Sequence, residues 1–220
     1  MRIYFKNLTV ARVVLRRQCP GIVLHPGEVV FDPIIAYYSD DYSDATNMAV
    51  KDIRLLGDPL LRADCAVVRR FGTRELSDLI RDLHDTLSDF RARRGFGRGI
   101  AAPQIGETRR VICIRADQSI ELVNPAIVRR GRKQMLLWDD CLSFPDLLVK
   151  VKRSYSIEVT YQDASGKRHR LRAEGPLSEL LQHEIDHING ILAIDRAIDS
   201  THIVMRSELE KLERGKTLTL

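Results

Sequence analysis

Two histidines, four residues apart on a helix, constrain this 220-residue chain more than any other feature. In segment 182–190, which reads QHEIDHING, His183 and His187 lie one turn apart on one face, where both imidazoles can bind one metal ion. Glu184 lies beside them, and its carboxylate can act as a general base on a water molecule. Gly175-Pro176 predicts the start of the helix and Gly190 its end. Along it runs an apolar stripe made by Leu177, Leu180, Leu181, Ile185 and Ile188. The alternative is an ordinary amphipathic helix with two chance histidines, but the chain has only six histidines and the glutamate is also in register.

The composition is that of an ordinary globular protein, with 44% hydrophobic and 30% charged residues. A net charge of +5 favours an anionic surface such as RNA, but no dense basic run indicates a specific nucleic-acid site, and a solvated basic surface is the alternative. The cysteines form no C-x-x-C pair, which indicates a reduced intracellular compartment without a disulfide framework. They are Cys19, Cys65, Cys113 and Cys141. No apolar run is long enough to span a bilayer.

The first 49 residues differ from the rest, since they contain a polar tract at 38–44 and no sustained periodicity. We expect a weakly ordered extension over 1–49 and a catalytic domain over 50–220. Two alternatives are a start of translation at Met48 and a transit peptide over 1–47, which would direct the chain to a mitochondrion or plastid. Transit peptides are usually rich in serine, and this segment is not, so a cytoplasmic location is expected.

Hydrophobic periodicity predicts an α+β fold with antiparallel strands and a few helices. Residues 74–93 carry apolar residues at helical spacing and predict an amphipathic helix. Short strands are expected at 110–115, 120–123 and 134–138. Segments 155–161 and 168–173 flank the turn residues 163–166 and predict a hairpin. A short charged helix is expected at 207–214.

A catalytic metal site needs a third protein ligand, and Cys141 is the candidate. It lies in segment 138–145, WDDCLSFP, between a predicted strand and a turn limited by proline. A buried small hydrophobe is the alternative for a lone cysteine. Segment 97–106, GRGIAAPQIG, lets backbone approach a ligand closely, and Gln104 offers an amide donor. This segment lacks the lysine of a P-loop and the third glycine of the dinucleotide fingerprint, so phosphate binding is rejected.

Taken together and in this order, the three segments resemble the motifs of peptide deformylases. The matching stretches are GRGIAAPQ at 97–104, DDCLS at 139–143 and QHEIDH at 182–187. The resemblance covers residues 53 to about 210. It implies an α+β fold in which antiparallel β-sheets pack around a central helix that carries the H-E-x-x-H motif.

The resemblance also implies roles for the site residues. The metal ligands would be Cys141, His183 and His187, and Glu184 would be the catalytic acid and base. The metal of the family is Fe²⁺ in the cell, and Zn²⁺ or Ni²⁺ replaces it readily. A thiolate with two imidazoles is compatible with each of these ions.

Two further groups of residues follow from the same resemblance. The side-chain amide of Gln104 and the backbone N–H of Leu142 would stabilise the oxyanion. The main chain of Gly97, Gly99 and Ile100 would bind an extended peptide substrate. The reaction would be removal of the formyl group from the N-terminal formylmethionine of nascent chains, with release of formate.

The second motif departs from the family pattern, which has Glu-Gly before the cysteine. Asp139 keeps a carboxylate that can pair with Arg153, although its side chain is shorter than glutamate. Asp140 replaces the glycine, which adds a negative charge beside the third ligand and restricts φ. The carboxylate of Asp140 would either raise the pKa of the water at the metal or point to solvent.

Three other departures concern the binding of the peptide. Arg98 and Glu179 stand where the family often has an aliphatic residue in the pocket for the methionine side chain. They would either pair with each other across the site or lie outside the pocket. Leu148 stands where many bacterial members have an arginine that holds the peptide backbone.

The expected function is therefore a metal-dependent peptide deformylase that acts on nascent formylated peptides, with the ribosome surface as a further partner. Three alternatives are a hydrolase of another formyl or acyl amide, a non-catalytic metal-binding relative and an H-E-x-x-H endopeptidase. An H-E-x-x-H endopeptidase would have no role for Cys141 or for segment 97–106. The sequence predicts no membrane partner and does not determine the oligomeric state.

Overall fold

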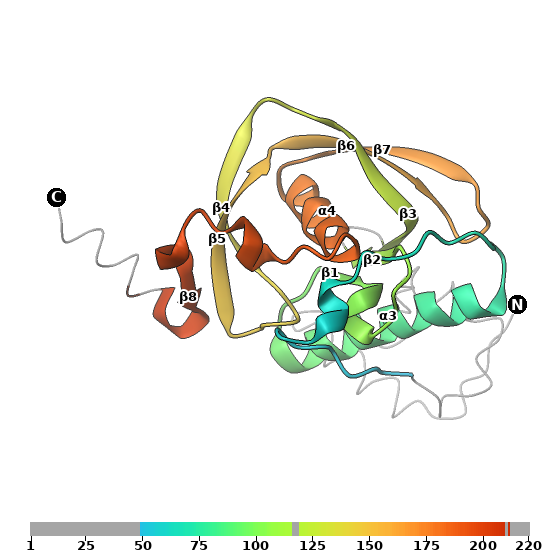
Figure 1. The fold of residues 1–220 in the computed structure, drawn as a ribbon, viewed down its shortest axis with the longest axis horizontal. Coiled ribbons are helices and arrows are strands. Elements are labelled where there is room, and N and C mark those ends of the chain that lie inside the picture. Colours follow the sequence, from blue (N-terminus) through green and yellow to red (C-terminus); the bar gives the residue numbers. More distant parts are fainter. Residues whose placement is uncertain (1–48, 116–118, 210, 212–220) are drawn as a thin grey trace, which may run out of the picture. The chain divides into compact units, whose positions relative to one another are not determined.

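The computed structural model describes residues 49–115, 119–209 and 211. The extension expected over 1–49 lies outside the described residues, apart from Ala49. The described chain is α+β, as predicted, with two antiparallel sheets and two long helices (Figure 1). No described helix is both long and apolar enough to span a bilayer.

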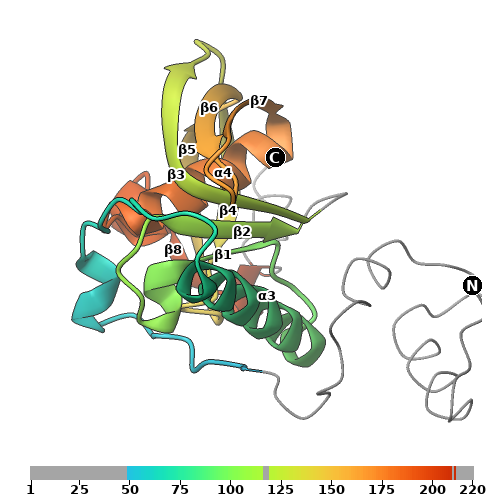
Figure 2. The same ribbon diagram turned by 90° about the vertical axis from the view of Figure 1, so that its right-hand side faces the viewer.

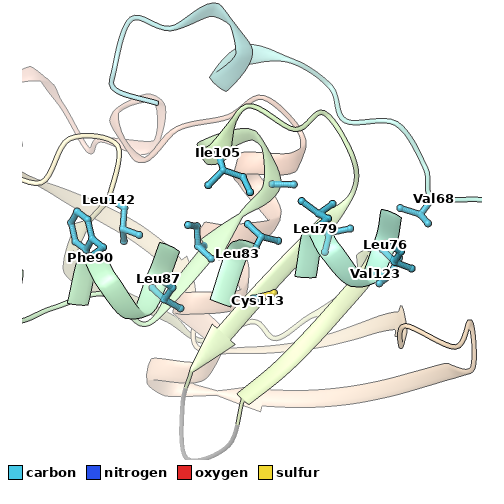
Figure 3. Close-up of a cluster of buried hydrophobic side chains, with 13 residues drawn as sticks. Val68, Leu76, Leu79, Leu83, Leu87, Phe90, Ile105, Cys113, Val123 and Leu142 are labelled. Carbon is cyan, nitrogen blue, oxygen red and sulfur yellow. The ribbon is translucent and has the colours of Figure 1, made fainter. Parts of the chain in front are cut away.

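Helix α3 covers Arg74–Arg94, in agreement with the prediction for 74–93. The side chain of Thr73 accepts a hydrogen bond from the Leu76 N–H, and Gly95 ends the helix in the left-handed region at φ 79°. The face that the periodicity predicted is buried, and Figure 3 shows its side chains lying against the sheet. Its buried apolar residues are Leu76, Leu79, Leu83, Leu87 and Phe90.

The larger sheet has five antiparallel strands in the order β1-β2-β3-β6-β7. Their bounds are Gly99–Ala101, Val111–Arg115, Ser119–Arg130, Ser156–Gln162 and Arg168–Glu174. The predicted hairpin of β6 and β7 is confirmed, as are strands β2 and β3. Strand β3 continues past its predicted end at residue 123 through a register shift between Val123 and Ala126. Pro125 has no N–H to donate to the ladder, so the strand pairs irregularly there.

Strand β2 separates two apolar layers because successive side chains point to opposite faces. Val111 and Cys113 pack in one cluster with α3, whereas Ile112 and Ile114 pack in another with helix α4. Figure 2 shows α3 lying alongside β1 and β2. The sheet is therefore buried on both faces in the region that carries β1.

The smaller sheet has three antiparallel strands in the order β4-β5-β8, with bounds Gln134–Asp140, Leu147–Ser154 and Ile203–Met205. Only β4 was predicted, at residues 134–138. Strand β5 does carry the alternation of valine and lysine at 149–152 that is typical of a strand with one buried face. Strands β1 and β8 have three residues each, which is too short for a periodic signal.

Helix α4, Gly175–Ile188, is the helix that carries the two histidines, and twelve of its fourteen residues are buried. It contacts strands of both sheets, and Figure 1 shows it enclosed by them. Gly190 follows it at φ 70°, and a Cβ there would lie 2.5 Å from the Arg62 carbonyl oxygen, so the predicted stop at this glycine is confirmed. The 3₁₀ helices are Pro59–Arg62, Ala102–Ile105, Ala193–Arg196, Ser200–His202 and Arg206–Glu208.

The helix expected at 207–214 is only partly described. The chain passes through the 3₁₀ turn Arg206–Glu208 and is helical at Leu209 and Lys211, while residues 210 and 212–220 lie outside the described residues. The described residues of the predicted span are thus in helical turns, but the strand β8 directly before it was not predicted.

Candidate metal centre

Three predicted ligands converge where α4 meets the end of β4. His183 and His187 lie one helical turn apart, with ring centroids separated by 4.9 Å. Cys141 follows β4 directly, and its Sγ is 3.2 Å from Nε2 of His187. All three residues are buried, and their ligand atoms lie within 4.8 Å of one another. Tetrahedral Zn²⁺ with bonds of about 2.0–2.3 Å needs ligand atoms roughly 3.5 Å apart, so the spacing fits one metal ion.

The surroundings of the three ligands also fit a metal. Asp139 Oδ1 lies 2.8 Å from Nδ1 of His183, which leaves Nε2 of that imidazole to face the centre. Glu184 Oε2 is buried and has no hydrogen-bond partner within the described part of the chain. A buried carboxylate oxygen without a partner is costly in a closed protein. This oxygen lies beside the three converging ligand atoms, where a metal ion and its water molecule would give it a partner.

Arg153 links the smaller sheet to helix α4. Its guanidinium donates to Asp139 at 2.9 Å and to Asp186 at 2.6 Å, and Asp186 also accepts from Arg196 at 2.9 Å. The predicted pair of Asp139 and Arg153 is therefore confirmed, and the shorter side chain reaches the guanidinium directly. Burial alone would raise the pKa of Asp139, but His183 and Arg153 lower it to about 2.

Asp186 and Arg196 were missed by the reasoning from sequence. Asp186 follows His183 by three residues within the motif itself, so its place on the same helix was a usable signal. Arg196 lies in a 3₁₀ helix after α4 and carries no comparable signal.

Glu184 lies against the main chain of strand β1. A Cβ added to Gly99 would lie 2.4 Å from Glu184 Oε1 and 2.9 Å from its Cγ. Glycine at this position therefore allows the close approach of the strand to the carboxylate. Burial raises the pKa of Glu184 to about 7, so the carboxyl is suited to exchange a proton near neutral pH.

Gln104 is held in one orientation by its own loop. Its Oε1 accepts the Ala101 N–H at 2.9 Å, and its Nε2 donates to Ser143 Oγ at 3.2 Å and lies 3.6 Å from Cys141 Sγ. The amide N–H groups therefore lie on the side of Cys141 and Ser143. Ser143, which fixes this orientation, was missed, although it belongs to the C-L-S segment.

A pocket opens beside these groups. Its lining residues are Gly97, Arg98, Gly99, Asp140, Leu142, Glu179, Leu180, His183 and Glu184. Arg98 and Glu179 do pair, with Nη2 and Oε2 at 2.5 Å, and Glu179 is buried. The side chain of Ile100 is not part of this lining, because it packs in the cluster with α3. Strand β1 pairs with β2 on one side only, so within the described residues its other edge is unpaired.

Asp140 turns toward the C-terminal segment. Its Oδ2 accepts a hydrogen bond from Arg206 Nη2 at 2.9 Å, with both side chains about one third exposed (33% and 37%). Asn124 is the one non-glycine residue with positive φ in the described ranges, so Asp140 has backbone that any residue adopts. Leu148 lies opposite it in the ladder and is 5% exposed. The expected restriction of φ at Asp140 is therefore no obstacle to the fold.

The fold and this site together define a metallohydrolase class, and comparison with known proteins identifies the family. The family model described as "Polypeptide deformylase" matches residues 50–202. The chain belongs to the polypeptide deformylase family, metal-dependent hydrolases that remove the formyl group from the N-terminus of nascent polypeptides.

Individual relatives agree with this. A peptide deformylase of Thermomicrobium roseum is 42% identical over 183 residues, which span 78% of this chain and all of the relative. The crystal structure of a peptide deformylase from Synechococcus elongatus in complex with actinonin is 34% identical, with a TM-score of 0.65 over 73% of this chain and 85% of that one. A peptide deformylase structure from Legionella pneumophila is 35% identical, with a TM-score of 0.64 over 76% and 98% of the two chains.

Proposed function

We propose that this deformylase holds one divalent metal ion on Cys141, His183 and His187, with Fe²⁺ as the physiological ion and Zn²⁺ or Ni²⁺ able to replace it. The convergence of these three buried ligand atoms within 4.8 Å is the observation that carries the proposal. When bound, the metal supplies Lewis acidity that polarises the formyl carbonyl and activates water. A thiolate and two imidazoles accommodate each of these ions.

Glu184 is the proton carrier of the proposed reaction. In its ionised form the carboxylate takes a proton from the attacking water, and in its protonated form it gives that proton to the leaving amine. Burial raises the pKa of Glu184 above that of an ordinary glutamate, which favours its protonated form for the second step. The amine leaves as the free N-terminus of the peptide, and formate is the second product.

Gln104 and Leu142 are proposed to stabilise the negative charge that develops on the formyl oxygen. The amide of Gln104 is already oriented by the Ala101 N–H and by Ser143 Oγ, so the plane of this donor is set before the reaction. Leu142 follows the metal ligand Cys141 directly and lines the pocket, where its backbone N–H can act as the second donor.

The peptide substrate is proposed to pair with the free edge of strand β1. Gly97, at φ 118°, and Gly99 both line the pocket, and the missing side chain at Gly99 lets the main chain approach Glu184 closely. Ile100 contributes main chain alone, since its side chain is buried. An extended peptide bound this way would add a strand to the sheet and place its N-terminal formyl group beside Glu184.

The proposed setting is the cytoplasm, on chains emerging from the ribosome. A net charge of +5 supports weak attraction to ribosomal RNA without a specific nucleic-acid groove. A mitochondrial or plastid setting would apply if residues 1–47 act as a transit peptide. In both settings the proposed catalytic domain is residues 50–220.

Formate release tests this function. The protein is purified without oxygen, loaded with Fe²⁺ or Ni²⁺, and assayed on formyl-Met-Ala-Ser beside acetyl-Met-Ala-Ser. We expect formate from the first peptide and no acetate from the second. Glu184→Gln should lower kcat at least about 100-fold, since general acid-base catalysis contributes about 10²–10⁴. Glu107→Gln, at a partly exposed glutamate outside the pocket, is the matched control. A protein with one metal per chain that releases no formate would contradict the proposal.

A further inference from the structure

Arg206 lies outside residues 50–202, the part of the chain that the family model matches, and yet it reaches the loop of the third metal ligand. Its Nη2 donates to Asp140 Oδ2 at 2.9 Å, and its Nε donates to the Pro145 carbonyl at 3.0 Å. The guanidinium also lies over the ring of Phe96, 4.1 Å from its centroid. Two segments that are distant from it in sequence, the loop 140–145 and Phe96, thus fix the Arg206 side chain.

These contacts surround Cys141. Asp140 precedes the cysteine directly, and Pro145 ends the loop that contains it. The backbone of Arg206 adds a further tie, because its N–H donates to the Asp146 carbonyl at 2.7 Å. Strand β8, immediately before Arg206, pairs with β5 and holds the C-terminal segment in register. The loop is therefore fastened at both ends to a single short segment.

Asp140 is the residue on which this fastening matters most for the reaction. It lines the same pocket as Glu184 and as Leu142, whose backbone N–H is the proposed donor to the formyl oxygen. A carboxylate free to turn into that pocket would repel the developing charge, because both are negative. The site stabilises such a charge with hydrogen-bond donors, and a carboxylate is an acceptor. Paired with Arg206, the carboxylate points instead to the C-terminal segment and its charge is balanced.

We propose that Arg206 is a positioning residue for the reaction: it holds the carboxylate of Asp140 away from the reacting carbonyl and so preserves the site around Cys141. The inference rests on the proposed function for its kinetic part. Arg206 touches neither metal ligand nor substrate, so it acts through Asp140.

The proposal predicts suppression of one substitution by another. Arg206→Met keeps the length of the stem and removes the charge, and we expect it to lower kcat on formyl-Met-Ala-Ser about 10-fold with little change in KM. Adding Asp140→Gly removes the freed carboxylate, so the double variant should return to within about threefold of the natural chain. If the double variant is as impaired as Arg206→Met alone, the proposal is overturned. If Arg206→Met has full activity, it is also overturned.

A spectroscopic measurement makes the test independent of catalysis. Co²⁺ bound through a cysteine thiolate gives absorption bands that report the geometry of the ligand. We expect these bands to change in Arg206→Met and to return in the double variant; unchanged bands in Arg206→Met would contradict the positioning role. If the natural chain released no formate, the proposed function would fail while the cobalt spectra still tested Arg206.

Two controls separate positioning from loss of folding. Arg94→Met removes a nearby exposed arginine that pairs with Asp146 at 3.5 Å, and it should leave activity and the cobalt bands unchanged. Arg206→Lys keeps a positive charge near Asp140 and should retain most of the activity, even if Arg206→Met unfolds on purification. A loss in Arg206→Lys equal to that in Arg206→Met would refute the role of the charge.

Discussion

Replacing Arg153 by methionine removes a guanidinium that lies between two buried carboxylates. The side chains of Arg153, Asp139 and Asp186 are 4%, 1% and 7% exposed, so water does not take over the lost hydrogen bonds. Removing one partner of a buried ion pair destabilises a protein by about 3–5 kcal/mol. Asp139 keeps His183 and Asp186 keeps Arg196 as neighbours, which places the expected loss near the lower end, about 3 kcal/mol.

Unfolding measurements test this value. With about 2–4 °C per kcal/mol for a chain of 150–250 residues, the melting temperature should fall by about 6–12 °C. Urea unfolding at matched metal content gives the free energy directly. The control is Arg93→Met, which breaks the exposed pair of Arg93 and Asp89 and should cost less than about 1 kcal/mol. Equal losses in the two variants would refute the argument from burial.

The remaining predictions concern three other carboxylates. Asp139→Asn removes the charge that faces one metal ligand and should weaken Zn²⁺ binding about 10- to 100-fold, measured by competition with a chelator; unchanged affinity would contradict the orienting role. Hydrogen bonds, chiefly from the Ser165 side chain, hold the pKa of Asp163 well below its ordinary value. Its stabilising effect is thus full above about pH 4 and is lost as the pH falls toward the native pKa, so Asp163→Asn should lose most stability, relative to the natural chain, near pH 7 and progressively less in acid. A constant difference across pH would argue against this. Replacing both Arg98 and Glu179 by isoleucine removes the ion pair from the pocket and should raise kcat/KM for formyl-Met over formyl-Ser peptides; an unchanged ratio would place the pair outside the substrate's path.

Strong periodicity and ordered motifs made much of this molecule predictable. Helix α3 and the hairpin of β6 and β7 follow from spacing alone, because each has a long enough run for its period to show. The closeness of the two histidines on α4 follows from helical geometry, since His183 and His187 share a face whatever surrounds them.

Other features depend on contacts between distant segments and could not be predicted. Strand β8 is three residues long and exists because β5 offers it an edge. The orientation of Asp140 depends on Arg206, 66 residues later in the chain. The carboxylate of Asp140 points away from the pocket because Arg206 pairs with it, and without this partner it would be free to turn inward. The residues next to Asp140 in the sequence do not distinguish these two orientations.

The proposed metal ligands come from two different parts of the architecture. Cys141 follows a strand of the smaller sheet, whereas His183 and His187 lie on the helix that packs against the larger one. The site therefore comes into existence only when both sheets have docked around α4. A chain with one half folded would offer an incomplete ligand set, so tight metal uptake belongs to the last stage of folding. Partly folded chains would then have no hydrolytic activity, and the bound ion would link the two sheets and stabilise their docking.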